Sequence, residues 1–273
     1  VVVVVVVAVV AVGSADDVYR KLSELPFPPF LEKGFILDGY EILEELHASS
    51  RSQLYRVKDT VSGQIMVMKT PSDNFSDDPA YIERLIMEEW VGSRIESDHV
   101  VKVIRPDRPR KFLYYLIEHV PGETLVGWMK KNPHPELTEV VRIIAQLIKG
   151  LRDFHRKETL HQDLKPDNIV LDADDNVKII DFGSVFISGI SEIQASIARD
   201  IILGTDEYAA PEYKLGRKSD DRSDMFSLAI IAYEMMTGML PWGESFSRCQ
   251  NVRDYRTLKY VPAYKHNPMV PIW

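Results

Sequence analysis

Acidic and amide side chains with the chemistry of a catalytic or metal-binding site occur in two segments, 161–168 and 181–183. Asp163 supplies a carboxylate that can accept a proton from a hydroxyl, while Asn168 and Asp181 supply the hard oxygen ligands that magnesium prefers. An HxD triplet is common by chance, and an Asp close to a Gly is usually part of a turn. Asn168 lies five residues after Asp163 and Asp181 lies 18 residues after it, and this combination argues against chance.

The segments that carry these residues follow a long amphipathic helix and flank a pair of short strands. Apolar residues recur at helical spacing over 137–156. Two apolar runs then predict strands at 169–171 and 177–180, the first directly after Asn168 and the second directly before Asp181. The candidate residues are therefore expected on the loops at the ends of these elements.

Apolar periodicity divides the chain into a β-rich first part and a helical second part. Alternation with a period of two begins at Tyr40 and predicts strands around 40–43, 54–57 and 65–68. The further elements expected are a helix at 79–95, strands near 100–104 and 112–118, and helices at 123–131, 137–156 and 224–237. The sequence contains no internal repeat.

The motifs in the two polar segments resemble those of eukaryotic-type protein kinases. HQDLKPDN, which begins at His161, resembles the catalytic loop of that family, and DFG, which begins at Asp181, resembles its metal-binding motif. The resemblance covers about residues 40–250. It implies an α+β, bilobal protein-kinase-like fold with an antiparallel β-rich N-lobe and a mainly helical C-lobe, and it implies ATP and Mg as cofactors.

By this resemblance, four polar residues act on the phosphates and on the substrate hydroxyl. Phosphoryl transfer depends on positioning the reactants and on offsetting the phosphate charge. Asp163 would accept or orient the proton of the hydroxyl, and Lys165 would lie beside the transferring phosphate. Asn168 and Asp181 would hold two Mg ions that bridge the phosphates. In the family, Lys at position 165 accompanies Ser/Thr substrates rather than Tyr, so the implied partner is a protein substrate with Ser or Thr.

Lys69 interrupts an apolar strand in the run Val67-Met68-Lys69, which resembles the VAIK strand of the family. Taken alone, it is equally well explained as a lysine on an exposed sheet edge. Glu88 lies 19 residues further on in the predicted helix, the interval expected for the Lys–Glu ion pair of the family. Adjacent Glu89 is the alternative partner, and we expect Glu88 to make the pair.

The loop expected to cover the nucleotide departs most from the family pattern. G-x-G-x-x-G is replaced by His-Ala-Ser-Ser-Arg-Ser at 47–52, so all three glycines are missing. Glycine allows close approach of the backbone and unusual dihedral angles. The hydroxyls of Ser49, Ser50 and Ser52 can still hydrogen-bond phosphate, and Arg51 can add a bidentate contact. A polar hairpin turn without a ligand is the alternative.

The resemblance also implies an adenine site at the end of the strand at 113–120. Ile117 would be the gatekeeper, and the Glu118 carbonyl and the Val120 amide would pair with adenine. The ring would lie between the apolar side chains of Leu46, Leu54, Val67 and Val170. Without the resemblance, these apolar residues would simply be assigned to the core.

The activation segment would run from Asp181 to Glu212 and end in GTDEYAAPE, which resembles GTxxYxAPE. Downstream, SDMFSL at 223–228 resembles the start of the central C-lobe helix, where Asp224 would accept backbone amides of the catalytic loop. From the sequence alone, Asp224 is also explained as a helix N-cap, and both roles can hold together.

Two replacements bear on how the activation segment is controlled. Gln162 replaces the Arg that usually grips a phosphate on this segment, and position 201, the usual site of that phosphate, is Ile. Both changes remove a part of the same contact. We therefore expect that activation does not require phosphorylation in this segment.

The composition is that of a globular protein. Of the 273 residues, 45% are apolar and 27% are charged, which excludes disordered, collagenous and disulfide-stapled classes. The net charge of -8 argues against nucleic acid as a partner, because phosphate neutralisation needs a basic face. Cys249 is the single cysteine and suits a reducing compartment, so we expect a cytoplasmic location.

The ends of the chain do not fit the kinase pattern. The valine tract at 1–12 is shorter than the roughly 20 apolar residues of a membrane helix and lacks the basic segment of a signal peptide. We expect no transmembrane segment and interpret 1–14 as an artefact or unassigned tract, with a β-prone strand as the alternative.

The expected domains are a linker at 15–38, the kinase N-lobe at 39–120 and the kinase C-lobe at 121–273, which we expect to be C-terminally incomplete. A complete lobe of the family supplies an Arg that pairs with the Glu at position 212. We therefore expect the Glu212 carboxylate to lack a partner.

Several stretches, including LPFPPFL, ELHASSRSQLYRV and LHQDLKPDNIV, resemble the kinase half of bacterial bifunctional proteins that join a Ser/Thr phosphatase to a Ser/Thr kinase. This resemblance implies a phosphatase domain in the full-length protein. The expected function is transfer of the γ-phosphoryl group of ATP to Ser/Thr hydroxyls of proteins. The alternatives are a pseudokinase scaffold, which would not need the full set of polar residues, and a small-molecule kinase, which fits poorly with Lys165 and the Ala-Pro-Glu run.

Overall fold

The computed structural model describes residues 21–76, 78–182, 186–187 and 206–271. These residues form two compact units. The first unit contains the residues up to Ser93 and Lys102–His119, and the second contains Arg94–Val101 and the residues from Val120 onward. The division differs from the expected lobes in that the short stretch at 94–101 belongs to the second unit. There, the Val101 amide donates to the Ile179 carbonyl at 2.8 Å.

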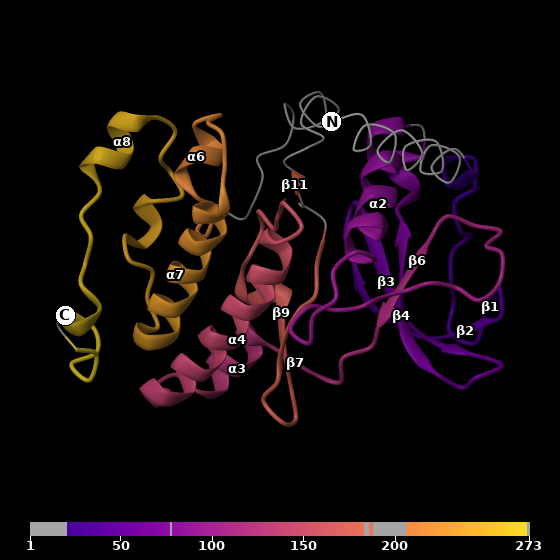
Figure 1. Ribbon diagram of the computed structural model, residues 1–273, viewed down its shortest axis with the longest axis horizontal. Helices are drawn as coiled ribbons and strands as arrows, with labels where there is room; N and C mark the ends of the chain where they lie inside the picture. The colour runs from indigo at the N-terminus through magenta and orange to yellow at the C-terminus, as the bar shows by residue number, and fades with distance from the viewer. Residues whose placement is uncertain (1–20, 77, 183–185, 188–205, 272–273) are drawn as a thin grey trace, which may run out of the picture. The chain divides into compact units, whose positions relative to one another are not determined.

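The first unit is built on one antiparallel sheet of six strands in the order β1-β2-β3-β4-β6-β5. Figure 1 labels all of these strands except β5. The strands are β1 (Ile36–Leu37), β2 (Tyr40–Ala48), β3 (Ser52–Asp59), β4 (Ile65–Pro71), β5 (Val103–Ile104) and β6 (Tyr115–Glu118). Burial alternates along the first half of β2 and the second half of β3, whereas β4 and β6 are buried along nearly their whole length. The predicted meander is confirmed.

Helix α2 (Pro79–Gly92) lies beside this sheet, after a short 3-10 turn η1 (Asp73–Phe75) (Figure 1). Its first residue is Pro79, and the side chain of Asp78 accepts hydrogen bonds from the amides of Ala80 and Tyr81. Proline at the first helical position and an acidic N-cap are both favourable at a helix start. The helix predicted at 79–95 is therefore confirmed, and its end comes slightly earlier.

The core of the first unit includes part of the stretch expected to be a linker. Leu31 and Leu37 are buried in the same cluster as Tyr40, Tyr55 and Met68 of the sheet. The amide of Leu113 also donates to the carbonyl of Pro26 at 2.8 Å. The second half of 15–38 is thus packed into the first unit, because its apolar side chains have a surface to cover.

The second unit is mainly helical, as expected, and also carries two small antiparallel sheets with the strand orders β10-β9-β7 and β11-β8. Its strands are β7 (Gly122–Thr124), β8 (Thr159–Leu160), β9 (Ile169–Asp172), β10 (Val177–Ile179) and β11 (Phe186–Ile187). Its helices are α3 (Leu125–Lys131), α4 (Leu137–His155), α6 (Pro211–Lys214), α7 (Asp221–Thr237) and α8 (Val252–Thr257), with 3-10 turns η2 (Pro166–Asn168), η4 (Gly243–Ser245) and η5 (Ala263–Lys265).

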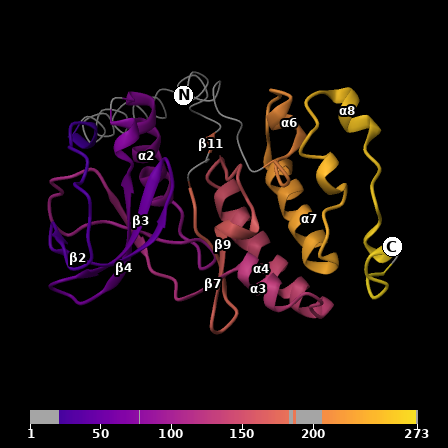
Figure 2. The same cartoon turned by 180° about the vertical axis from the view of Figure 1, so that it is seen from behind.

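Helices α4 and α7 pack side by side, and both views of the molecule show them so (Figures 1 and 2). The apolar side of α4 buries residues at helical spacing, such as Ile143, Leu147 and Leu151, as its periodicity predicts.

Gly122 of β7 lies so close to β9 that a Cβ atom there would be 2.0 Å from the Leu171 carbonyl oxygen. In the described part of the chain, no helix is long and apolar enough to cross a membrane.

Candidate active site

The first unit brings together Lys69 of β4 and Glu88 of α2, the pair predicted from their spacing. Lys69 Nζ lies 2.7 Å from Glu88 Oε2, and the two residues are 9% and 7% exposed. The hydroxyl of Tyr115 on β6 donates to the same carboxylate oxygen at 2.9 Å. A buried charge is stable only when it is paired and hydrogen-bonded, so three elements cooperate to hold the ammonium group.

Glu89, the alternative partner, has a different role. Its carboxylate pairs with Arg110 Nη1 at 2.9 Å. Burial raises the pKa of Glu89, and the charge of Arg110 opposes that rise without cancelling it. The two neighbouring acids of α2 therefore serve separate pairs, and Glu88 is the partner of Lys69 as expected.

The glycine-free loop forms a tight turn between β2 and β3. Ser49 Oγ accepts hydrogen bonds from the amides of Arg51 at 3.2 Å and Ser52 at 3.0 Å, and the Ser49 amide donates to the Ser52 carbonyl at 2.9 Å. Ser49 Oγ also donates to the Ser52 carbonyl. The Ser49 hydroxyl predicted to bind phosphate is thus engaged in shaping the turn.

The apolar residues expected around adenine have different surroundings. Val67 and Ile117 are register partners on β4 and β6 and are nearly buried, whereas Leu46 on β2 is 45% exposed and Leu54 on β3 is half-buried. The Glu118 side chain accepts a hydrogen bond from the Lys102 amide at 3.0 Å. In the second unit, Val170 is nearly buried on β9 and Val120 is half-buried.

The second unit gathers the catalytic-loop residues. Lys165 Nζ lies 3.1 Å from Asp163 Oδ2. Asn168 Nδ2 donates to the Asp163 carbonyl at 2.9 Å and lies 3.3 Å from Asp163 Oδ2. One oxygen of the Asp163 carboxylate, Oδ2, is thus contacted by both an ammonium group and an amide.

Asn168 and Asp181 have the chemistry of magnesium ligands. The amide nitrogen of Asn168 serves Asp163, so its carbonyl oxygen is the atom left for a cation. The backbone carbonyl of Asn168, which is distinct from its side-chain oxygen, accepts the Ile180 amide at 3.0 Å and so ties Asn168 to the residue before Asp181. Among the described residues, no group of three or more His, Cys, Asp or Glu side chains could hold a metal by itself. This donor set fits Mg²⁺, which takes few protein oxygens and completes its shell with water and phosphate.

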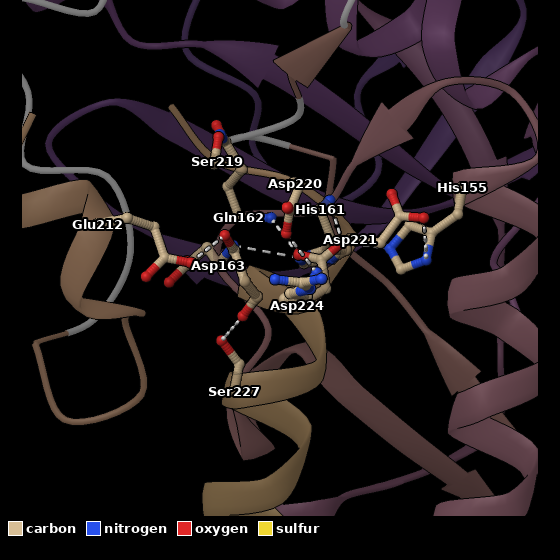
Figure 3. A network of polar contacts seen from close by, with 12 residues as sticks. His155, His161, Gln162, Asp163, Glu212, Ser219, Asp220, Asp221, Asp224 and Ser227 are labelled. Carbon is tan, nitrogen blue, oxygen red and sulfur yellow. Dashed lines mark hydrogen bonds and ion pairs between the residues drawn. The ribbon is translucent and has the colours of Figure 1, made fainter. Parts of the chain in front are cut away.

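Asp224 of α7 anchors the backbone of the catalytic loop (Figure 3). It is fully buried and accepts the amides of His161 at 3.0 Å and Gln162 at 2.9 Å. This contact was expected from the resemblance. The N-cap role is wrong, because the cap of α7 is Asp220, whose side chain accepts the Arg222 amide.

Gln162 occupies a left-handed backbone conformation with φ of 65°. Such a conformation is uncommon for a residue other than glycine. The bond from its amide to Asp224 holds the backbone there, while its side chain donates to Ser219 Oγ at 3.1 Å (Figure 3). Where the family has a charged Arg side chain, this chain therefore has an uncharged Gln side chain that hydrogen-bonds a serine.

Much of the activation segment lies outside the described residues, including Ser191, Ser196 and Ile201. Its C-terminal end is described. Ser223 Oγ donates a hydrogen bond to the Glu212 carboxylate. The expectation that this carboxylate lacks a partner is therefore wrong, because a hydroxyl from α7 reaches it.

Two contributors to the site were missed by the sequence analysis. Tyr115 bonds Glu88, and His155 at the end of α4 bonds Asp224, with Nε2 2.8 Å from Oδ2. His155 is the fourth residue after Leu151 and so falls on the apolar side of α4, which was a usable signal. Tyr115 gave no such signal, because an aromatic residue in a strand is ordinary.

The comparison with known families decides the identity of the fold. A model of the protein kinase domain matches residues 40–272. The chain belongs to this family. Membership confirms the α+β, bilobal kinase fold that was expected, with a β-rich first unit and a mainly helical second unit.

This kinase domain is similar to several bacterial serine/threonine-protein kinases. It is 29% identical over 203 residues to a probable kinase of Clostridium acetobutylicum, covering 74% of this chain and 30% of the relative. It is 26% identical over 207 residues to PrkC of Bacillus subtilis, covering 76% and 32%. For pkn3 of Myxococcus xanthus, identity is 27% over 235 residues, covering 84% and 43%. The chain thus spans less than half the length of these curated relatives.

Proposed function

We propose that this kinase domain transfers the γ-phosphoryl group of ATP to Ser/Thr hydroxyls of proteins. The observation that carries the proposal is the arrangement at Asp163. Its carboxylate lies beside Lys165 Nζ at 3.1 Å and near the Asn168 amide, on a backbone anchored by Asp224. The relatives named as serine/threonine-protein kinases support the same function.

In this mechanism the hydroxyl oxygen forms a bond to the γ-phosphorus as the bond from that phosphorus to the leaving ADP oxygen breaks. Asp163 orients the hydroxyl and accepts its proton. Lys165 offsets the negative charge of the transferring group. Because Asp163 and Lys165 already lie together, little reorganisation is needed, which is how positioning lowers the barrier.

Lys69 is the residue that we assign to the α- and β-phosphates of ATP, with Glu88 and Tyr115 keeping its ammonium group in place. Magnesium, when bound, would offset phosphate charge, and the side-chain oxygen of Asn168 and the Asp181 carboxylate would hold it. We assign the adenine contacts to Ile117, Glu118 and Val120, and the contacts with the ring faces to Leu46, Leu54, Val67 and Val170. Ser49 and Ser52 would shape the phosphate loop.

The sequence also supports proposals about the other domains and the location of the full-length protein. We propose that the full-length protein also carries a phosphatase domain, as the HASSRSQ loop and its flanking stretches suggest, and that it acts in the cytoplasm. The buried single thiol of Cys249 suits that compartment. The net charge of -8 argues against nucleic acid as a substrate.

The decisive experiment compares the chain with its Asp163→Asn variant. Each is incubated with Mg²⁺, labelled ATP and a generic basic protein, and the labelled residues are identified. We expect label on Ser and Thr, and a loss of about 10²- to 10⁴-fold in the variant, because the proton acceptor is gone. Asp167→Asn makes the same chemical change at an exposed neighbour and should retain activity.

The pseudokinase alternative makes a different prediction for the same samples. Transfer would be absent from the unmodified chain as well as from the Asp163→Asn variant. Thermal unfolding with and without Mg²⁺ and ATP would then tell whether nucleotide still binds, since a ligand that binds only the folded state raises Tm.

A further inference from the structure

The hydroxyl of Tyr81 lies where three segments of the first unit meet. Tyr81 is the third residue of α2 and is 8% exposed. Its hydroxyl donates to the carbonyl of Arg51 in the turn between β2 and β3. The same oxygen accepts the amide of Ser72, which follows β4, at 3.1 Å. One side chain therefore joins the glycine-free loop, the strand that carries Lys69 and the helix that carries Glu88.

Neighbouring contacts strengthen this junction. The Ser72 amide also donates to the Arg51 carbonyl at 3.0 Å. The ring of Phe75 stacks on the ring of Tyr81 with centroids 5.0 Å apart, and Asn74 Nδ2 reaches the Ser50 carbonyl at 3.5 Å. Burial raises the pKa of Tyr81, so its hydroxyl keeps the proton that it donates at neutral pH.

The loop has little freedom of its own to adjust. The amides of Ser49, Arg51 and Ser52 are all used within the turn, by the Ser52 carbonyl and Ser49 Oγ. A glycine-rich loop can adapt its backbone to the phosphates, whereas internal hydrogen bonds hold the backbone of this turn. Its position must therefore be set by contacts outside the turn, and the described contacts of its tip lead to residues 72–76 and to Tyr81.

Tyr81 and Glu88 are also connected through α2. They lie seven residues apart, which places them about two turns apart on one side of the helix. A shift of α2 that disturbs the pair between Glu88 and Lys69 would pull on the Arg51 carbonyl as well.

We propose that Tyr81 is a positioning residue that holds the β2–β3 loop in place for ATP and couples the position of this loop to the Lys69–Glu88 pair. The part of the proposal that concerns ATP rests on the proposed kinase function. The hydrogen-bonded junction itself does not.

The test is the Tyr81→Phe variant, which removes the hydroxyl and keeps the ring. The variant loses two hydrogen bonds of the hydroxyl, but the Ser72 amide keeps its bond to the Arg51 carbonyl. A net cost equal to about one hydrogen bond predicts about a two- to tenfold increase in KM for ATP and in the hydrogen-exchange rate of a peptide spanning 47–53. We expect kcat to change by less than about twofold, since the Asp163 cluster is untouched. A merely structural role would lower Tm without separating KM from kcat.

Tyr114→Phe is the matched control. Tyr114 is also buried in the first unit, and its hydroxyl donates to Asp38 at 3.2 Å, away from the loop. This variant should leave KM for ATP and exchange at 47–53 unchanged. Equal effects from both variants would overturn the proposal, because they would indicate a general loss of stability.

Other outcomes are equally informative. If the hydrogen-exchange rate at 47–53 does not change in Tyr81→Phe, the proposal that Tyr81 holds the loop is wrong. If exchange becomes faster but KM for ATP does not change, the proposed link between the loop position and ATP binding is wrong. If Tyr81→Phe does not fold, Asn74→Ala, which removes only the contact to the Ser50 carbonyl, must show the same changes in weaker form. If the unmodified chain has no transfer activity, the proposed function fails, and exchange together with the Kd for ATP still decides the role of Tyr81.

Discussion

Asp224 accepts the backbone amide of Gln162 at 2.9 Å, so a carboxylate on α7 fixes the backbone directly before Asp163. The second oxygen of the same carboxylate accepts the His161 amide and contacts His155. The catalytic loop is therefore positioned by the interior of its own unit.

This anchor predicts the effect of Asp224→Asn. The amide nitrogen of Asn cannot accept a hydrogen bond, so one buried backbone amide loses its acceptor, at a cost of about 1–3 kcal/mol. We expect a lower Tm and a fall in kcat of about tenfold or more, with KM for ATP nearly unchanged. Steady-state kinetics and thermal unfolding measure these effects. An unchanged kcat would show that the loop does not need the anchor.

Two ion pairs made by neighbouring acids of α2 predict contrasting effects of substitution. Lys69→Met leaves Glu88 without its cation, and Arg110→Met does the same to Glu89, so each should destabilise the chain by about 3–5 kcal/mol. Only Lys69→Met should abolish phosphoryl transfer, because only Lys69 is assigned to the phosphates. Activity assays below the Tm of both variants separate the two roles. Loss of activity in both variants would contradict the assignment.

His155 predicts a pH dependence of stability. Burial lowers its pKa, but the hydrogen bond to Asp224 and the charge of Asp221 outweigh burial, so the pKa is raised on folding. The protonated form is therefore favoured by folding. Its contribution is fully present below the unfolded pKa of about 6.5 and is lost as pH rises through the raised folded pKa.

Thermal unfolding from about pH 5.5 to about pH 8.5 tests this sign. The advantage in Tm of the unmodified chain over His155→Asn should shrink as pH rises. Exposed His134→Asn is the control and should run parallel to the unmodified chain. Parallel curves for His155→Asn would contradict the prediction.

Gln162 predicts independence from phosphorylation of the activation segment. Its side chain is bonded to Ser219 and carries no charge to grip a phosphate. A chain with Ser191→Ala and Ser196→Ala, treated with a phosphatase, should keep kcat within about twofold of the unmodified chain. Transfer assays with mass spectrometry of the segment check this, and abolished activity would refute it.

Gly122 predicts a packing defect. In Gly122→Ala, the new Cβ would meet the Leu171 carbonyl oxygen at 2.0 Å, and backbone cannot move aside as a side chain can. We expect a loss of about 1–3 kcal/mol in the free energy of unfolding. Gly127→Ala is the control, because the closest atom to its Cβ would be an oxygen of the flexible Glu123 side chain at 3.0 Å, and alanine favours a helix. Denaturant unfolding of the two variants gives the comparison.

The elements that were predicted correctly are those with strong periodicity. Helix α4, the first half of β2 and the second half of β3 bury residues at regular spacing, so their apolar pattern was visible in the sequence. Strand β4 is buried along nearly its whole length and was visible from its apolar residues. The start of α7 was placed later than Asp221, because its first turn is polar and has no apolar period. Leu31 was assigned to a linker because a single apolar residue among prolines shows no period, although it is buried in the core.

The sequence predicted those site residues that belong to motifs with a fixed spacing. Lys69, Glu88 and Asp224 were placed correctly, since the intervals between motif residues are fixed by the fold. Contacts across the first unit were not predictable. The bond between Tyr81 and the Arg51 carbonyl depends on where the backbone of a turn lies, and no residue type in the sequence encodes that position.

The anchoring of the catalytic loop also has a consequence for biosynthesis. Asp224 lies 62 positions after Gln162, so a ribosome makes the whole HQDLKPDN stretch well before the carboxylate that organises it. A nascent chain at that stage holds every polar group of the loop but not the geometry. The geometry of the loop is therefore complete only when α7 has been synthesised and has packed against α4.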